Sequence, residues 1–525
     1  MEPSCIRQTE LPHTTKLFAD YIYHPDRVAS FFPYSTNDPE AFSKAAAAID
    51  FPDDRRAALV AALRRQNGDH PALETLSRPG TVAVVTGQQV GLFSGPAYTV
   101  YKALTAVHLA RRLSAQGIPA VPVFWLATED HDFAEVNQAW VFDAQHRPVE
   151  LRAEAMPGPG QPVGTITIGN APWEQAAQAM RDLPFAEEAV ALARDAYQPG
   201  RTFGEAFAAL VDALVGKFGL LRVDPMAPEM RALAAPLLRE AVAAAPELTD
   251  ALLERGKQLA AAGYHTQVHV EATTSLFFLL DQNQRLNLRR QGDTYLAQGR
   301  RLSSAELRDQ AQRLSPNALL RPVVQDYMLP TVAYIGGPAE LAYLAQSQVL
   351  YRRLLGRQPI ALHRAGFTLI DARSARRIER FGLELPAFFH GEERLREQIA
   401  AKLVPPPVLS AIAEARRGTA ATLEKLSGEL ASFDASLKDA LATSRRKIEY
   451  QVAKIERKIG REALSRDARA AEQAASLYGL IYPNKHLQER LYSILPFIAK
   501  HGVGVIDEIN ETLQLDCPDH RVLEL

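Results

Sequence analysis

Two short apolar runs mark the amino-terminal part of the chain, and a helical pattern lies between them. The runs cover residues 81–85 and 120–126, and each is continuous, as in a strand buried on both faces. Between them, apolar residues recur every three or four positions, and a helix is expected from Pro96 to Gly117. The pattern predicts a strand–helix–strand unit of a parallel sheet.

Strand and helix patterns continue after this unit, with two interruptions. We therefore predict an α/β fold whose parallel-sheet core carries two insertions. Apolar spacing predicts a strand over residues 163–168, one long helix over 228–263 and a further sheet strand over 315–326. The predicted division is 1–141 for the first part of the core, 142–172 for the first connecting insertion, 173–265 for the continued core, 266–314 for the second connecting insertion, 315–388 for the rest of the core, 389–481 for a helical coiled-coil domain and 482–525 for a C-terminal segment that returns to the core.

The coiled coil is predicted in a proline-free stretch from residue 408 to residue 482. One uninterrupted helix of this length would extend about 110 Å at about 1.5 Å per residue. Residues 434–436 can cap a second helix, so a helical hairpin is favoured. Its apolar seam is longer than a hairpin covers internally, which predicts a homodimer. The seam consists of Leu423, Leu426, Leu430, Phe433, Leu437, Ile448, Val452, Ile455 and Ile459.

Composition excludes several classes of protein for this 525-residue chain. It is 47% hydrophobic and 23% charged, as in soluble proteins, and its formal charge of -2 gives no global attraction to nucleic acid or to an anionic membrane. No signal-peptide pattern and no long apolar span is present, so we expect a cytoplasmic protein. The cysteines, Cys5 and Cys517, are too few for a disulfide framework, and either can be a free surface thiol.

A glycine turn follows the first predicted strand. Its sequence fits neither the Walker phosphate loop nor the dinucleotide-binding fingerprint. Amide, hydroxyl and ammonium groups nevertheless gather at the start of the next helix, where anions bind. A tight structural turn with surface glutamines is the alternative. The candidate substrate- or anion-binding residues are Thr86, Gly87, Gln88, Gln89, Gly95, Tyr98, Thr99 and Lys102.

An acidic cluster follows the second strand and consists of Glu129, Asp130, His131 and Asp132. Like charges this close are relieved by a cation, a substrate ammonium group or a proton. Acid–base catalysis or amine binding is therefore favoured. Metal binding is disfavoured because no spaced His or Cys pair accompanies the cluster, and a capped, solvated turn is a further alternative. Asn137 is a candidate ligand on the short helix that follows, which Asp132 and Glu135 are expected to cap.

A second strand, glycine turn and helix occupy residues 329–340. A proline opens this helix as well, so both turns are expected to face one crevice. Arg321 can hold a carboxylate through two hydrogen bonds, and an internal ion pair with Asp326 is an equal alternative. The candidate binding residues here are Arg321, Gln325, Asp326, Gly336, Gly337 and Glu340.

Together these motifs resemble the cysteine-adding enzymes of bacillithiol biosynthesis, and the likeness covers nearly the whole chain. The matching stretches occur in one order, at residues 86–89, 95–102, 124–137, 320–326, 333–343 and 482–490. The resemblance implies a Rossmann-like core with two connecting insertions, similar to class I aminoacyl-tRNA synthetases, and a coiled coil that mediates dimerisation. It also implies a ligase that joins cysteine to the amine of glucosaminyl-malate through an amide bond.

An adenine nucleotide, ATP or ADP, is a further implication of the resemblance, with Tyr482, Lys485 and Arg490 as candidate ligands and no metal assigned. The glycine turn lacks the histidine pair of the class I aminoacyl-tRNA synthetases, so the likeness to these enzymes concerns the fold and does not extend to their nucleotide-binding motif. Two rival functions are nucleotidyl transfer to another small acid and a non-catalytic dimeric scaffold. Polar turns at two strand ends favour an enzyme, because a scaffold would not need them.

Overall fold

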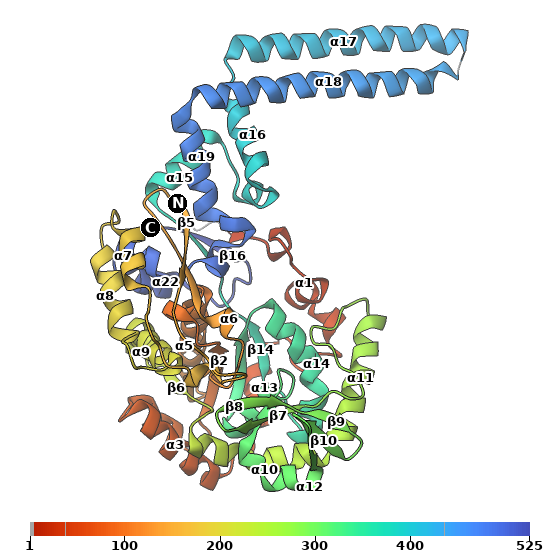
Figure 1. Ribbon diagram of the computed structural model, residues 1–525. Coiled ribbons are helices and arrows are strands. Elements are labelled where there is room, and N and C mark those ends of the chain that lie inside the picture. The colour runs from red at the N-terminus through yellow and green to blue at the C-terminus, as the bar shows by residue number, and fades with distance from the viewer. Residues whose placement is uncertain (1–4, 37, 435) are drawn as a thin grey trace.

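The computed structural model describes residues 5–36, 38–434 and 436–525 (Figure 1). Its centre is a five-stranded parallel sheet with the order β14-β13-β2-β3-β6. The strand order reverses between β2 and β13, and ligands bind open α/β sheets at the carboxyl ends of the strands beside such a point. The strands are β2 (Val82–Gln88), β3 (Ala120–Leu126), β6 (Leu221–Val223), β13 (Thr331–Gly336) and β14 (Ile360–His363).

The predicted strand–helix–strand unit is confirmed. Helix α5 (Tyr98–Ala115) connects β2 to β3 and packs on both strands. The chain leaves this helix through Gly117, whose φ of +87° is a left-handed conformation that glycine adopts without strain. Successive side chains of β3 face opposite layers, so Phe124 joins the core beneath α5 and Trp125 joins the core on the other face.

Helices cover both faces of the sheet. One face carries α5 and α9 (Phe203–Val215), and the other carries α10 (Pro228–Ala243), α11 (Ala245–Ala261) and α14 (Pro338–Leu354). The single long helix predicted over residues 228–263 is therefore wrong. Pro246 lies in the first turn of α11 and has no N–H to continue the ladder of α10.

The first insertion begins with an antiparallel hairpin of β4 (Gln138–Phe142) and β5 (Pro148–Arg152), so it starts at residue 138 and not at the predicted residue 142. The strand predicted over residues 163–168 is wrong, because residues 163–165 form the short helix η4 (Val163–Thr165). There the backbone of Gly164 packs on Thr128 with no room for a Cβ atom. The N–H of Val163 donates to the carbonyl of Asp130 at 2.6 Å. The first insertion thus holds the acidic cluster in place.

The second insertion contains two small antiparallel sheets. One has the order β12-β7-β8, and the other has the order β11-β10-β9. The sheet strand predicted over residues 315–326 is wrong: β12 (Leu314–Pro316) pairs with β7, and residues 321–328 form α13 (Arg321–Met328), which Pro322 opens. The other strands are β7 (Phe277–Asp281), β8 (Gln284–Asn287), β9 (Arg289–Gln291), β10 (Thr294–Ala297) and β11 (Arg300–Ser303).

The predicted helical hairpin is confirmed and projects from the rest of the molecule (Figure 1). Its arms are α17 (Pro406–Phe433) and α18 (Leu437–Arg466). At the bend the Asp434 carboxylate accepts a hydrogen bond from the N–H of Ser436 at 2.8 Å, while Ala435 lies outside the described residues. The base is supported by α16 (Glu392–Leu403), which packs against Gly460 of α18.

The C-terminal segment returns to the core, as predicted. Strand β16 (His520–Glu524) lies between β1 (Cys5–Ile6) and β15 (Phe367–Ile370), so the two ends of the described chain share one sheet. Within residues 5–36, 38–434 and 436–525, no helix is long and apolar enough to cross a membrane. The remaining α-helices are α1 (Lys16–Tyr23), α2 (Ala41–Ala47), α3 (Asp53–Asn67), α4 (Pro71–Ser77), α6 (Phe133–Val136), α7 (Trp173–Met180), α8 (Ala186–Ala196), α12 (Ser304–Asp309), α15 (Ala372–Phe381), α19 (Ala468–Ile481), α20 (Gln488–Leu491), α21 (Leu495–His501) and α22 (Val505–Thr512).

Candidate functional site

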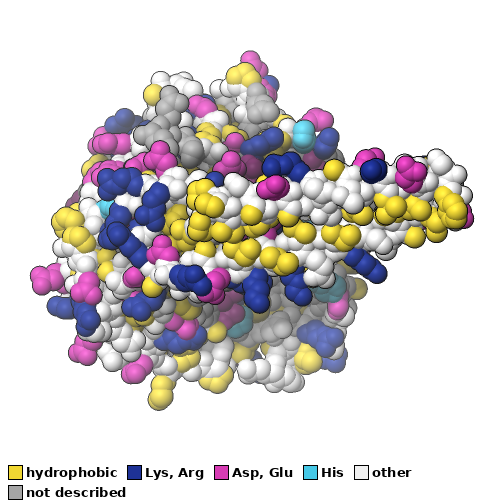
Figure 2. All heavy atoms as spheres, turned by 90° about the horizontal axis from the view of Figure 1, so that it is seen from above, with side chains coloured by type: hydrophobic (Ala, Val, Ile, Leu, Met, Phe, Trp, Pro, Cys, Tyr) yellow, Lys and Arg dark blue, Asp and Glu magenta, His cyan; other side chains and the backbone are white. Residues whose placement is uncertain are grey.

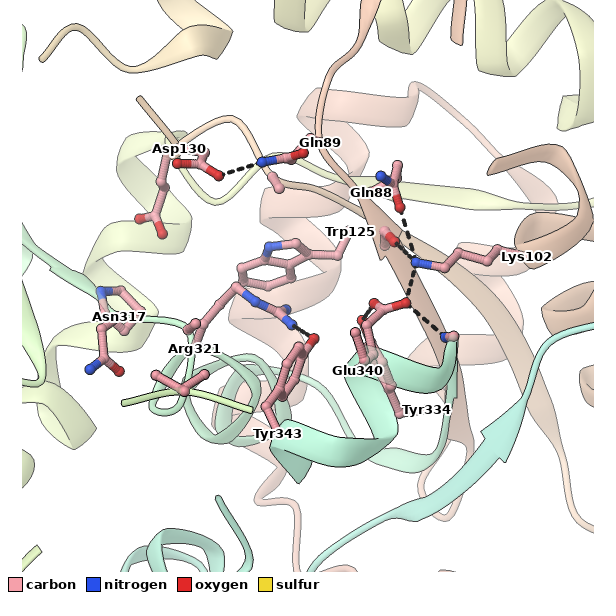
Figure 3. Close-up of a pocket in the computed structure, with 18 of the residues that line it drawn as sticks. Gln88, Gln89, Lys102, Trp125, Asp130, Asn317, Arg321, Tyr334, Glu340 and Tyr343 are labelled. Carbon is pink, nitrogen blue, oxygen red and sulfur yellow. Dashed lines mark hydrogen bonds and ion pairs between the residues drawn. The ribbon is translucent and has the colours of Figure 1, made fainter. Parts of the chain in front are cut away.

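A cavity of about 630 Å³ lies at the carboxyl ends of β2, β3 and β13 (Figure 3). The two glycine turns, the acidic cluster and the second insertion all reach it. Gly87 allows β2 and β3 to approach at this edge, because a Cβ atom there would lie 2.8 Å from the carbonyl oxygen of Trp125. The lining includes the predicted residues Gly87, Gln88, Gln89, Tyr98, Lys102, Glu129, Asp130, His131, Arg321, Gly337, Glu340 and Arg490.

Lys102 is a buried cation at the wall of this cavity. Its ammonium group donates to the carbonyl of Gly87 and to the side-chain oxygen of Gln88, each at 3.0 Å, and pairs with Glu340. The side chain of Lys102 is only 3% exposed, so its charge acts in a medium of low polarity. The glycine turn is therefore held by a fixed positive charge.

Glu340 links the second glycine turn to Lys102. Its carboxylate accepts hydrogen bonds from the Tyr334 hydroxyl at 2.6 Å and from the N–H of Gly337 at 2.8 Å. Burial works to raise the pKa of Glu340, but the charge of Lys102 together with the hydrogen bonds from Lys102, Tyr334 and Gly337 lowers that pKa. The carboxylate therefore stays ionised, and the two strand–turn–helix units are joined by a charged contact.

Arg321 faces the cavity from α13, and its guanidinium donates to Gln325 at 3.0 Å and to the Tyr343 hydroxyl at 2.8 Å. The alternative ion pair with Asp326 is not formed among the described residues, because the Asp326 carboxylate accepts hydrogen bonds from Gln325 and Tyr351. Gln325 and Asp326 are fully buried behind the cavity. They orient Arg321 and leave its charge available to a ligand.

Asp130 belongs to the acidic cluster and lines the cavity, and several polar groups contact its carboxylate. Its carboxylate accepts hydrogen bonds from the Gln89 side chain at 2.7 Å and the N–H of His131 at 2.8 Å, and it lies 3.6 Å from Arg285. Burial works to raise the pKa of Asp130, but these hydrogen bonds and the charge of Arg285 lower it. Asp130 is thus an ionised acceptor.

The other members of the acidic cluster have different surroundings. Arg285 lies 3.2 Å from Nδ1 of His131, and since arginine only donates, that nitrogen accepts and a neutral imidazole carries its proton on Nε2. Glu129 forms a buried ion pair with Arg231. Asp132 is exposed and makes no side-chain cap, and Glu135 instead accepts from Gln89 at 2.6 Å, so the predicted capping box is wrong.

Arg364 and Arg490 add two cationic groups to the lining of the cavity. Arg364 forms a buried two-point ion pair with Glu489, at 2.6 and 3.0 Å, and its guanidinium carbon lies 5.0 Å from the ring centre of Tyr98. Arg490 is exposed, lines the cavity and makes no side-chain hydrogen bond or ion pair within the described parts of the chain. An incoming anion can therefore use the Arg490 guanidinium without breaking an existing contact.

Trp125 supplies an unused donor. Its indole lies between the Asp130–Gln89 pair and Arg321 in Figure 3. The side chain is 2% exposed, and its N–H has no hydrogen-bond partner among the described residues. A buried donor without a partner costs about 1–3 kcal/mol, which a ligand acceptor in the cavity would recover.

Several predicted residues lie outside the cavity. Thr86 is buried and donates to the carbonyl of Ile335 at 2.9 Å, and Tyr482 packs against the Phe389 ring at a centroid distance of 5.3 Å. Lys485 lines a smaller neighbouring cavity of about 270 Å³, which shares Arg364 and Arg490 with the main one. The residues that the structure places behind or beside the main cavity are Thr86, Gly95, Thr99, Asp132, Asn137, Gln325, Asp326, Gly336, Tyr482 and Lys485.

Two cavity arginines were not singled out from the sequence. Arg285 lies on β8 of the second insertion, its guanidinium 3.9 Å from the ring centre of Phe278, and no local motif marks it. Arg364 directly follows β14, and its position at the carboxyl end of a buried strand is the sequence signal that could have identified it as a cavity residue. Among the described residues, no group of three or more His, Cys, Asp or Glu side chains is arranged to hold a metal ion.

The fold and the cavity define a Rossmann-like protein with a polar cavity at the switch point of its sheet. Residues 1–365 match the family described as "Bacillithiol biosynthesis BshC, N-terminal Rossmann-like domain". Residues 367–525 match "Bacillithiol biosynthesis BshC, C-terminal coiled-coil domain". The chain belongs to this family, which confirms the resemblance seen in its motifs.

Curated relatives support the assignment over the full length. A protein of Solibacter usitatus is 57% identical over 529 residues, and one of Koribacter versatilis is 38% identical over 535 residues, each match covering 100% of both chains. A protein of Salinibacter ruber is 30% identical and covers 97% of this chain and 96% of its own. All three carry the name "Putative cysteine ligase BshC".

Proposed function

We propose that this protein is a cysteine ligase of bacillithiol biosynthesis that joins the carboxyl group of cysteine to the amine of glucosaminyl-malate. The names of the full-length relatives support this assignment. The observation that carries it is the lining of the main cavity, which combines the ionised Asp130 carboxylate with the cationic side chains of Lys102, Arg321 and Arg490. Such a cavity suits an amine and carboxylates bound together.

In this proposal Asp130 receives the attacking amine. A carboxylate with a lowered pKa is a weak base toward a free ammonium group, but it accepts a hydrogen bond from the neutral amine and orients it. Once the C–N bond forms, the nitrogen becomes cationic and far more acidic, and Asp130 can then take its proton. Gln89 and Arg285 hold the carboxylate at 2.7 and 3.6 Å, respectively, for that step.

The carboxylates of the malate portion are assigned to Arg321. Arg321 offers a planar guanidinium that the Tyr343 hydroxyl contacts at 2.8 Å, which suits a carboxylate better than a lysine does. Trp125 offers its free N–H to a carbonyl oxygen near the reacting centre. Lys102 adds positive charge from the wall without leaving its contacts with the glycine turn.

An adenine nucleotide is proposed as the co-substrate. A carboxylate is unreactive toward an amine, and the nucleotide would supply activation as an acyl-adenylate or acyl-phosphate. Lys485 and Arg490 suit its phosphates, because neither side chain makes a hydrogen bond or ion pair within residues 5–36, 38–434 and 436–525, and both line the smaller cavity. Tyr482 is only 4% exposed, so it would support the nucleotide site without contacting the nucleotide directly.

A homodimer and a cytoplasmic location complete the proposal. The predicted seam divides into two rows: Leu423, Leu430, Leu437, Val452 and Ile459 are half-buried, whereas Leu426, Phe433, Ile448 and Ile455 are exposed. Figure 2 shows a band of hydrophobic side chains along the face of the hairpin that is turned to the viewer. The exposed residues within each arm lie seven positions apart, as Ile448 and Ile455 do, and this is the spacing with which one helix packs against another. A second copy of the chain would provide the helices that pack against them.

A deletion strain and the purified enzyme test this function. The strain should lose bacillithiol and accumulate glucosaminyl-malate, and the purified protein given cysteine, glucosaminyl-malate and ATP should form the amide, detected by mass spectrometry. Normal bacillithiol in a strain without a second copy of the gene would contradict the proposal. Nucleotide cleavage with no amide, driven by another small acid, would support the nucleotidyl-transfer alternative.

A further inference from the structure

The two cysteines lie at opposite ends of the sequence and meet in space. The Sγ atoms of Cys5 and Cys517 are 3.5 Å apart, although 512 positions separate the residues. Cys5 is exposed and Cys517 is half-buried, so small reagents can reach the pair. Two thiols in contact at an accessible site are the arrangement that thiol–disulfide exchange requires.

The surrounding structure holds both cysteines in this position. Strand β1 pairs with β16 in antiparallel register, with Cys5 opposite Arg521. The side chain of Gln8 donates to the carbonyl of Pro518 at 2.8 Å, next to Cys517. The N–H of Gln8 also donates to the Tyr23 hydroxyl at 2.8 Å, and that hydroxyl donates to Asp519. To form a covalent bond, the two Sγ atoms therefore need only a movement of the cysteine side chains, and the register between β1 and β16 does not have to change.

We infer that Cys5 and Cys517 form a reversible disulfide by exchange with low-molecular-weight disulfides. The Cys517 thiolate attacks one sulfur of the reagent and releases the first small thiolate. Cys5 then attacks Sγ of Cys517 and releases the second. Two protein thiols and one small disulfide thus become one protein disulfide and two small thiols, which carry away the two protons.

The order of attack follows from the surroundings of Cys5. Partial desolvation of the largely exposed thiol, the hydrogen bond with Cys517 and the negative charge of a Cys517 thiolate raise the pKa of Cys5 to about 11. Cys5 therefore stays protonated while Cys517 reacts. After Cys517 has formed the mixed disulfide, its negative charge is gone, and Cys5 ionises more easily for the second step.

Oxidation would fix the N-terminal arm, residues 5–15, to the C-terminal strand. The arm lines the smaller cavity through Gln8, His13 and Thr15, next to Arg364 and Arg490. Disulfides in the reducing cytoplasm are usually transient, so this bond would form and break as the ratio of small disulfides to small thiols in the cell changes. The inference is independent of the reaction proposed for the main cavity.

Incubation of the full-length protein with hydroxyethyl disulfide tests the inference. Wild type should lose two hydrogens in intact mass, give one cross-linked peptide containing Cys5 and Cys517, and recover with dithiothreitol. Cys5→Ser and Cys517→Ser should each carry one reagent adduct instead. Stable adducts on both cysteines of wild type, or covalent dimers, would overturn the inference.

A second measurement tests the consequence for the arm. Amide hydrogen exchange in residues 5–15 should slow at least severalfold in oxidised wild type and should not slow in Cys5→Ser after the same treatment. Equal exchange in reduced and oxidised wild type would show that the disulfide does not restrain the arm.

Discussion

Lys102 on α5 and Glu340 on α14 form a buried ion pair at the wall of the main cavity. The two helices follow β2 and β13, which are neighbours in the sheet and flank its switch point. The pair therefore connects the two halves of the Rossmann-like core where the ligand is expected to bind.

Glu340→Gln should destabilise the protein strongly. It leaves the Lys102 charge buried without its counter-ion, which typically costs about 3–5 kcal/mol. The midpoint of urea unfolding should fall accordingly, and a second change, Lys102→Met, should restore much of the loss because it removes the stranded charge. Glu40→Gln is the matched control, since Glu40 pairs with Lys44 on the surface at 3.0 Å and its loss should change little. An equal effect of the two Glu→Gln changes would contradict the buried-pair argument.

Glu489 should make stability depend on acid pH. Burial works to raise its pKa, but the charges of Arg364 and His520 together with the hydrogen bonds from Arg364 and the N–H of Phe367 lower the pKa from the ordinary 4.5 to about 2. Because the folded-state value is the lower one, the contribution is fully present above pH 4.5 and is lost as the pH falls towards 2. Its size is about 3 kcal/mol. Urea unfolding of wild type and Glu489→Gln should therefore differ most at neutral pH and converge in acid. A constant difference across this range would contradict the assignment.

Asp130 and Gln88 should differ sharply in their effect on the reaction. Asp130→Asn removes the group that accepts the amine proton and should lower kcat about 10²–10⁴-fold, and His131→Ala should also impair turnover strongly. Gln88→Ala removes one neutral contact with the substrate, worth about 1 kcal/mol, and should weaken substrate binding less than tenfold. It also removes the Gln88 contact of Lys102, but the Gly87 carbonyl and Glu340 still hold that ammonium group. Steady-state kinetics with the folded variants, checked by circular dichroism, measure both. If the Asp130 and His131 variants stay within tenfold of wild type and a chelator abolishes activity, the cluster is a metal site instead.

Trp125→Phe tests the free indole N–H in the cavity. The carbonyl oxygen assigned to this N–H becomes negatively charged as the C–N bond forms, and a hydrogen bond to a charged group is worth about 1.5–3 kcal/mol, so kcat/KM should fall roughly 10–100-fold with the fold intact. Trp173→Phe is the matched control, because the Trp173 indole donates to the carbonyl of Tyr197 at 3.3 Å, away from the cavity. Unchanged kcat/KM in Trp125→Phe would exclude a contact between the indole N–H and the substrate.

The coiled coil should separate into monomers when its outer row becomes charged. Ile448→Asp with Ile455→Asp places carboxylates on exposed positions, at 37% and 59% exposure, and should abolish the dimer while the helix content stays constant. Val452→Asp and Ile459→Asp change the half-buried row and should instead disrupt the hairpin. Analytical ultracentrifugation and circular dichroism distinguish these outcomes. A wild-type protein that is already monomeric at micromolar concentration would contradict the proposal.

The sequence predicted the central unit well because its signals are local. β3 was expected at residues 120–126 and occupies them, since a continuous apolar run between polar turns has few other structures open to it. The hairpin was predicted for a similar reason, because a long stretch without proline keeps one period. Fold class and family follow from such signals.

Errors arose where neighbours in space decide the structure. The apolar stretch around Arg321 looks extended, but Pro322 opens a helix there. The cavity itself depends on contacts that no motif encodes, such as Arg285 against His131 at 3.2 Å across 154 positions. Tertiary packing, and not residue type, gives these arginines their roles.

The main cavity is lined by residues as far apart in the sequence as Gly87 and Arg490, so a ribosome synthesises its parts at very different times. A nascent chain that has emerged only as far as the coiled coil already contains the acidic cluster and both glycine turns, yet it lacks Glu489, so Arg364 has no counter-ion. The cavity therefore closes only after Glu489 and Arg490 have been synthesised, and chains truncated before these residues should hold no substrate.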